Sequence, residues 1–180
     1  AARVRSGALS ASSVIRDTLD RVAKVNGRVN AIIQDCGADA MAEAEALDAR
    51  IAKGEAVGAL AGVPVTIKVL SDQAGYASTN SCRIFKDVMA TEDAPFLRHL
   101  REKDAIVIGR TNTPAFSYRW FSTNNFYGDT KNPHNDTLTA GGSSGGAGAA
   151  VATGMGHIGH GTDIAGSIRY PAYARSEERR

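Results

Sequence analysis

The sequence has few cysteines, little net charge and no long apolar run. Its two cysteines, Cys36 and Cys82, lie far apart and form no CxxC pair, which favours buried free thiols over a disulfide or a metal site. The net charge of +2 comes from interspersed residues of both signs, so no basic stripe indicates a nucleic-acid partner. No segment approaches the roughly 18 consecutive apolar residues that a membrane-spanning helix needs. These absences favour a soluble protein that binds neither nucleic acid nor membrane.

The N-terminus has Arg3 and Arg5 but no apolar segment after them, which argues against a signal peptide and favours a cytoplasmic location. With 180 residues and 43% hydrophobic composition, the chain is long enough to bury one core. No shift in composition marks a second domain, so we expect a single one.

Helix and strand patterns alternate along the first two thirds of the chain. Helices are predicted from a cap at Ser10 to an end at Asn26-Gly27, over residues 38–53, and from residues 91–93 onward. β-branched runs predict strands over 63–69 and 105–109, and the helix between them predicts parallel pairing. The aromatic region 116–127 has no periodicity and either lines a pocket or covers core edges. The pattern as a whole favours an α/β fold.

Glycine, serine and small apolar residues crowd into the stretch from 140 to 172. Glycines flank Ser143 and Ser144 with backbone that can take positive φ and pack close to a ligand. Ser167 follows Ser143 by 24 residues, again beside a glycine that lets backbone N–H groups converge. The pattern predicts a site built on serine.

Three segments resemble the amidase signature family: GVPVTIK at 62–68, GGSSGG at 141–146 and GTDIAGSIRYPA at 161–172. The resemblance implies an α/β fold with a mixed central sheet flanked by helices. It also implies hydrolysis of the C–N bond of a small-molecule amide, through an acyl-enzyme and without cofactor or metal. Ser167 matches the nucleophile, Ser143 the proton-relaying serine after a cis peptide bond, and Lys68 the base.

The same resemblance assigns further roles around the nucleophile. The backbone N–H groups of Ile164, Ala165, Gly166 and Ser167 correspond to the oxyanion hole. Supporting polar positions are matched by Ser144, Thr162, Asp163 and Arg169. Ala165 stands where the family usually has glycine, and its Cβ would strain the loop if that position needed a positive φ.

A lysine base must lose its proton, although a free lysine, with a pKa near 10.4, is neutral only about once in 2,500 molecules at pH 7. Lys68 follows the apolar residues Val65 and Ile67 and precedes Val69, with no acidic neighbour in the sequence. Burial among them would lower its pKa, because desolvation disfavours the charged form.

Three other motif interpretations are weaker. The segment 142–146 also fits the nucleophile elbow G-x-S-x-G with Ser144 as nucleophile, but no histidine follows Asp163 to complete that triad. The segment 154–159 fits the dinucleotide pattern G-x-G-x-x-G without a convincing strand before it. His157, His160 and Asp163 could ligate a metal, but they lack the spacing of a zinc-hydrolase helix.

Members of the amidase signature family are more than twice as long, so residues 1–173 are expected to be the N-terminal portion of one amidase domain, followed by a charged tail at 174–180 that does not match the family. Two alternatives to an active amidase stay open, namely an amidotransferase-type subunit and an inactive remnant. Because a sheet cut through its middle has an unpaired edge, we expect aggregation, a homo-oligomer or loose packing, and little or no turnover by the chain alone.

Overall fold

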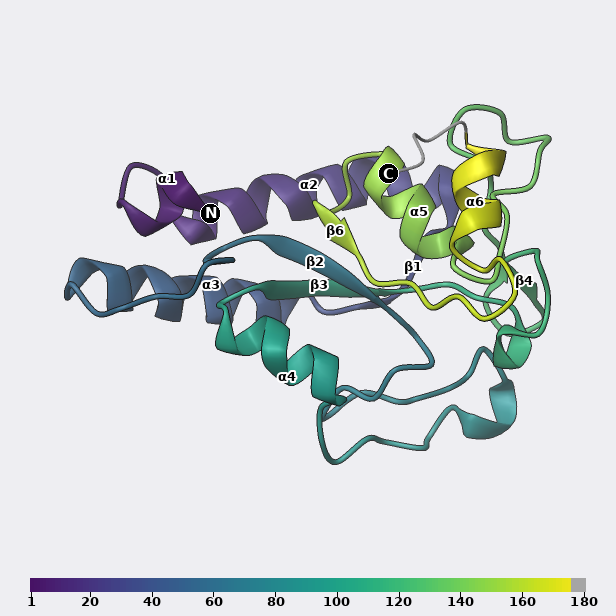
Figure 1. Ribbon diagram of the computed structural model, residues 1–180, viewed down its shortest axis with the longest axis horizontal. Helices are drawn as coiled ribbons and strands as arrows, with labels where there is room; N and C mark the ends of the chain where they lie inside the picture. The colour runs from purple at the N-terminus through teal and green to yellow at the C-terminus, as the bar shows by residue number, and fades with distance from the viewer. Residues whose placement is uncertain (176–180) are drawn as a thin grey trace.

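The computed structural model describes residues 1–175 and has a four-stranded sheet at its centre (Figure 1). The strands are β1 (Ile32–Asp35), β2 (Pro64–Lys68), β3 (Ile106–Thr111) and β6 (Ile158–Gly159), in the order β1-β3-β2-β6. β2 pairs in parallel with β3 and β6, whereas β1 runs antiparallel to β3. The α/β class, the mixed sheet and the parallel pairing of the two predicted strands are therefore confirmed.

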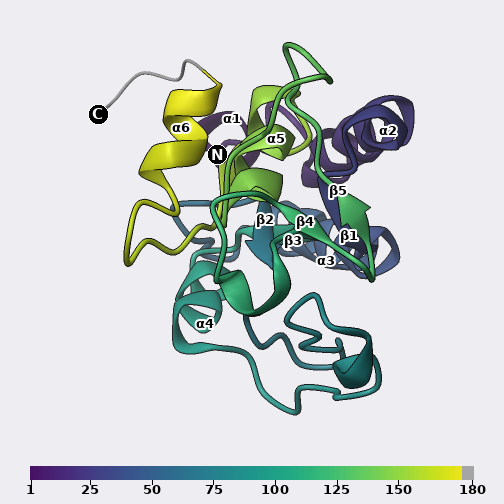
Figure 2. The same ribbon diagram turned by 90° about the vertical axis from the view of Figure 1, so that its right-hand side faces the viewer.

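Helices cover both faces of this sheet. They are α1 (Ala2–Arg5), α2 (Ala11–Val29), α3 (Gly37–Ala52), α4 (Pro95–Glu102), α5 (Gly145–Ala152) and α6 (Arg169–Ala174). Two short 3-10 turns, η1 (Arg83–Phe85) and η2 (Ala115–Ser117), and a small hairpin of β4 (Thr123–Asn124) and β5 (Gly128–Asp129) complete the described chain. Figure 2 shows α2 and α5 on one side of the sheet and α4 on the other.

The alternation of side chains along β3 divides the core between the two faces. Ile106 and Ile108 belong to a cluster with α2, α3 and α5, while Val107 packs with Val65, Ile67 and α4 on the opposite face. Successive residues of a strand point to opposite faces, so a strand buried on both sides needs apolar residues throughout. This burial fixes the strand whose last residue is Lys68.

Two predicted helix boundaries are wrong. α2 does not end at Asn26-Gly27, because the Asn26 side chain accepts N–H groups of Ala31 and Ile32 from within the helix, which continues to Val29 and ends at Asn30 with φ 51°. α4 begins at Pro95 rather than at 91–93, because the Asp93 carboxylate accepts the N–H of Ala74 and ties that segment to a loop.

Both cysteines are free thiols, but only one of them is buried as predicted. Cys36 is buried and Cys82 is half-buried, because Cys82 lies in the loop before η1 rather than under the sheet. No helix in the part of the chain that the structure describes is long and apolar enough to cross a membrane. Residues 176–180 of the expected charged tail lie outside the described residues.

Candidate active site

Lys68 is the last residue of β2 and has no exposed surface. Its Nζ lies 2.9 Å from Ser143 Oγ and 2.9 Å from Thr162 Oγ1, so it donates to two hydroxyl groups from different loops. The predicted contact between Lys68 and Ser143 is confirmed. Thr162, expected only to support the site, contacts the lysine directly.

The burial of Lys68 lowers its pKa to about 8, against the opposing effect of the negative charge of Asp163. Desolvation disfavours the ammonium form, and the two hydroxyl partners do not replace the negative charge that would restore it. At a pKa of about 8, about one molecule in ten would hold Lys68 neutral at pH 7. A neutral amine can accept a proton from a hydroxyl group.

Ser143 lies on a loop that another side chain holds in place. The peptide bond between Gly142 and Ser143 is cis, as the resemblance implied. Ser122, which sequence analysis passed over, donates from its hydroxyl to the Ser143 carbonyl at 3.3 Å and accepts the Gly145 N–H at 3.0 Å. The Ser122 side chain therefore fixes both ends of the turn that precedes α5.

Ser167 lies on the loop after β6 and lines a cavity of about 350 Å³ together with Ser143 and Thr162. The Ser144 N–H donates to the Ser167 carbonyl at 3.0 Å, and the Ser144 hydroxyl bonds with the backbone of Thr162. The two serine loops are thus joined through Ser144. Among residues 1–175 no hydrogen bond links Ser143 Oγ to Ser167 Oγ, so the relay between them stays a prediction.

Asp163 organises the loop that carries Ser167. Its carboxylate accepts the N–H groups of Gly166, Ile168 and Arg169, and it also pairs with the Arg169 guanidinium at 2.9 Å. These contacts hold the pKa of Asp163 well below its usual range, chiefly through Arg169. The two supporting residues therefore act on each other and on the loop backbone.

The backbone N–H groups assigned to the oxyanion hole are in two states. Gly166 N donates to Asp163 Oδ1 at 2.7 Å, whereas no hydrogen bond in the described chain engages the N–H of Ile164, Ala165 or Ser167. The positive φ of this loop, 103°, belongs to Gly166, and Ala165 is not among the residues with positive φ. The alanine in place of glycine thus imposes no left-handed strain.

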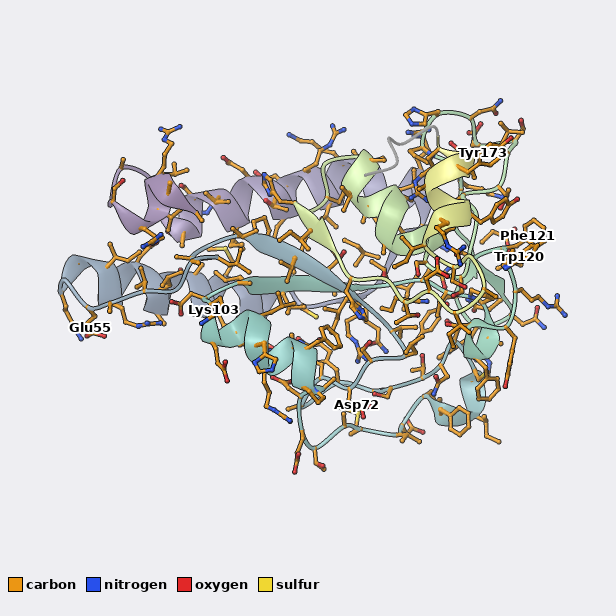
Figure 3. All side chains as sticks on the ribbon, viewed as in Figure 1. Glu55, Asp72, Lys103, Trp120, Phe121 and Tyr173 are labelled. Carbon is orange, nitrogen blue, oxygen red and sulfur yellow. The ribbon has the colours of Figure 1, made fainter. Side chains whose placement is uncertain are left out.

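Aromatic side chains form the outer wall of the cavity. Phe116, Tyr118 and Trp120 line it beside Ile164 and Ala165. Figure 3 shows Trp120 and the neighbouring Phe121 at the same end of the molecule as α6. Of the two sequence interpretations of this region, a pocket lining therefore holds for these three aromatic residues.

The competing motifs do not form their expected structures. The dinucleotide pattern at 154–159 lies between α5 and the strand β6, so it follows a helix and leads into a strand instead of the reverse. His160 stacks on Phe96 at 3.9 Å, and burial lowers its pKa to about 4. In residues 1–175 no group of three or more His, Cys, Asp or Glu side chains could hold a metal ion.

Comparison with known proteins assigns this fold and site to a family. The model of the Amidase family matches residues 13–175, and the chain belongs to that family. It is 49% identical to an indoleacetamide hydrolase of Bradyrhizobium diazoefficiens over 96% of this chain and 33% of that protein. One of the glutamyl-tRNA(Gln) amidotransferase subunits of Alkaliphilus metalliredigens is 37% identical over 88% of this chain and 32% of that protein.

Solved structures agree with the family assignment. A bacterial aryl acylamidase of the amidase signature family superimposes with a TM-score of 0.90 at 37% identity, over 94% of this chain and 36% of that one. The peptide amidase of Stenotrophomonas maltophilia gives 0.87 at 28% identity, over 95% and 36%. The chain spans about a third of the length of the curated relatives it matches.

Proposed function

We propose that this chain is the serine-bearing part of an amidase, in which residues 1–173 form the N-terminal portion of one domain. The proposal rests on one observation above the others: the buried Lys68 Nζ lies 2.9 Å from Ser143 Oγ, on the wall of a cavity that also includes Ser167. A buried amine that donates to a serine hydroxyl is the arrangement that activates a serine nucleophile without histidine.

In the proposed reaction Ser167 Oγ attacks the amide carbonyl carbon. Its proton passes to Ser143 Oγ as the Ser143 proton passes to neutral Lys68, which becomes the ammonium. The oxyanion of the tetrahedral intermediate accepts hydrogen bonds from the free backbone N–H groups of the nucleophile loop.

When the intermediate collapses, the C–N bond breaks and the proton returns from Lys68 through Ser143 to the leaving nitrogen. The ester on Ser167 is then hydrolysed when water attacks its carbonyl carbon and gives up a proton along the same path. The acid is released, and Lys68 is neutral again for the next cycle.

We propose a small carboxylic amide with a flat aromatic group as the substrate. The cavity has aromatic side chains on its outer wall, and such faces pack well against aromatic rings. The similar indoleacetamide hydrolase and aryl acylamidase bear names of aromatic amide chemistry. We also propose a cytoplasmic location, because both cysteines are free, as is usual in reducing compartments.

Covalent labelling of the 180-residue chain tests the nucleophile. The chain is incubated with an aryl fluorophosphonate and with an activated aryl ester, and the adduct is measured by intact mass and located by peptide mapping. We expect a single adduct on Ser167, none in Ser167→Ala, and unchanged labelling in Ser6→Ala, which removes an exposed hydroxyl in the turn after α1.

Two other results would contradict the assignment. An adduct on Ser144 would favour the nucleophile elbow, and no adduct on a chain whose circular dichroism and thermal melt show it to be folded would favour an inactive remnant.

A further inference from the structure

One peptide group in the nucleophile loop is bound on both sides by side chains from different parts of the molecule. The Trp120 indole Nε1 donates to the Ala165 carbonyl at 3.0 Å, and the Gly166 N–H donates to Asp163 Oδ1 at 2.7 Å. These two backbone groups belong to the same peptide unit. Since the C=O and N–H of a trans peptide point in opposite directions, the two partners prevent its rotation from both sides.

The loop needs such restraint because Gly166 follows this peptide unit with a φ of 103°. Glycine takes positive and negative φ with nearly equal ease, so the peptide before it can rotate at little cost. Rotation would turn the neighbouring N–H groups of Ala165 and Ser167, which have no partner in the described chain. Their direction is what an oxyanion hole depends on.

We propose that Trp120 is a positioning residue: its indole N–H holds the Ala165–Gly166 peptide so that the adjacent backbone N–H groups face the reacting carbonyl oxygen. This inference rests on the proposed function for its consequence, but the restraint itself can be measured without any reaction. The other partner, Asp163, already belongs to the nucleophile loop. Trp120 lies 45 residues earlier in the chain, so it ties that loop to the aromatic wall.

Two features of the surroundings support this role. Trp120 also lies beside Tyr170, with ring centroids 6.0 Å apart, so the loop and the start of α6 both contact it. A Cβ at Gly142 would lie 2.8 Å from the Trp120 carbonyl carbon, which shows that the backbone of this segment also packs directly on the turn that carries Ser143. Trp120 therefore contacts both serine loops.

Trp120 is the one tryptophan in the sequence, so the indole N–H gives a single resonance in a ¹⁵N-labelled sample. We expect its exchange with water to be slowed relative to a free indole, and its chemical shift to change when Ser167 is acylated. Exchange at the rate of a free indole would overturn the restraint, whether or not Ser167 reacts.

The kinetic test uses Trp120→Phe, which keeps an aromatic ring and removes the donor, and a chain with 3-benzothienylalanine at position 120, which keeps the ring shape as well. Labelling of Ser167 is measured over a range of probe concentrations. We expect the saturating rate to fall roughly tenfold to a hundredfold in both, while the concentration for half-saturation changes little. A structural disturbance alone would change both quantities.

Phe121→Leu is the matched control, because Phe121 is the next residue, is exposed to a similar extent and also contacts Tyr170, but does not line the cavity. It should label at the wild-type saturating rate. An unchanged saturating rate in both Trp120 variants would overturn the proposal. If wild type itself fails to label, the proposed function falls, while the exchange measurement still decides whether Trp120 holds the loop.

Discussion

Lys68 Nζ and Ser143 Oγ lie 2.9 Å apart although 75 residues separate them in the sequence. Lys68 ends a strand that is buried along its whole length, and Ser143 lies in the turn before α5, which packs on the same strand. The contact therefore arises from the packing of a helix on a sheet. It puts a lysine of lowered pKa against a hydroxyl group.

The first prediction concerns the pH dependence of labelling. The pKa of Lys68 is lowered to about 8, so the neutral base is depleted below that pH and nearly complete above it. The rate of Ser167 acylation should fall about tenfold for each pH unit below 8 and reach a plateau above about 9. Stopped labelling followed by intact mass measures it, and a rate independent of pH from 6 to 9 would contradict the role of Lys68.

The second prediction concerns stability. Between pH 8 and 10.5 the unfolded chain binds a proton at Lys68 that the folded chain does not, so the free energy of unfolding should increase with pH over this window. The increase should be on the order of 3 kcal/mol if Lys68 acts alone. Urea unfolding at several pH values measures it, and in Lys68→Met, which has no group to titrate there, the increase should disappear.

The third prediction separates the two hydroxyl partners of Lys68. Ser143→Ala should slow Ser167 labelling by about a hundredfold to ten-thousandfold, because the relay loses its middle group. Thr162→Val removes the second acceptor but leaves the relay, so its effect should be smaller. Equal effects in the two variants would show that Ser143 is merely a second ligand of the lysine.

The fourth prediction concerns the glycines before α5. A Cβ at Gly146 would lie 2.5 Å from the Asn112 carbonyl oxygen and 2.6 Å from its nitrogen, both of them backbone atoms that cannot easily move. Gly146→Ala should therefore lower the free energy of unfolding by about 2 kcal/mol or more. Gly27→Ala, inside α2 with open space around it, should raise it by up to about 1 kcal/mol. Both follow from thermal or urea unfolding.

The fifth prediction is that the chain alone shows little or no amidase turnover. Trp120 on the cavity wall is 54% exposed and Ile164 is 99% exposed, so the described site does not exclude water or enclose a substrate. Positioning errors of about 1 Å can cost a hundredfold in rate. Release of acid from aliphatic and aromatic amides is the assay. Robust turnover that both Ser167→Ala and Lys68→Met abolish would contradict this expectation.

Local pattern predicted most elements, but it missed some of their ends. The Ser10 cap, the second helix and the two β-branched strands follow from propensity and periodicity, and they are present. Asn26 looked like a helix end because Asn-Gly usually is one. Its side chain instead bonds to backbone several residues on, a choice that depends on where β1 begins.

The sequence by itself determined the family and the residue types of the site, because the three motifs place a lysine and two serines in fixed local backbones. Only the tertiary structure decided which groups meet. Asp163 takes the Gly166 N–H, Thr162 contacts Lys68, and Trp120 reaches the Ala165 carbonyl. The last two contacts join segments 94 and 45 residues apart, and their formation depends on how α5 and the loop after β6 pack against the sheet rather than on any local preference. Burial likewise sets the pKa of Lys68, since desolvation comes from neighbours that the strand acquires on folding.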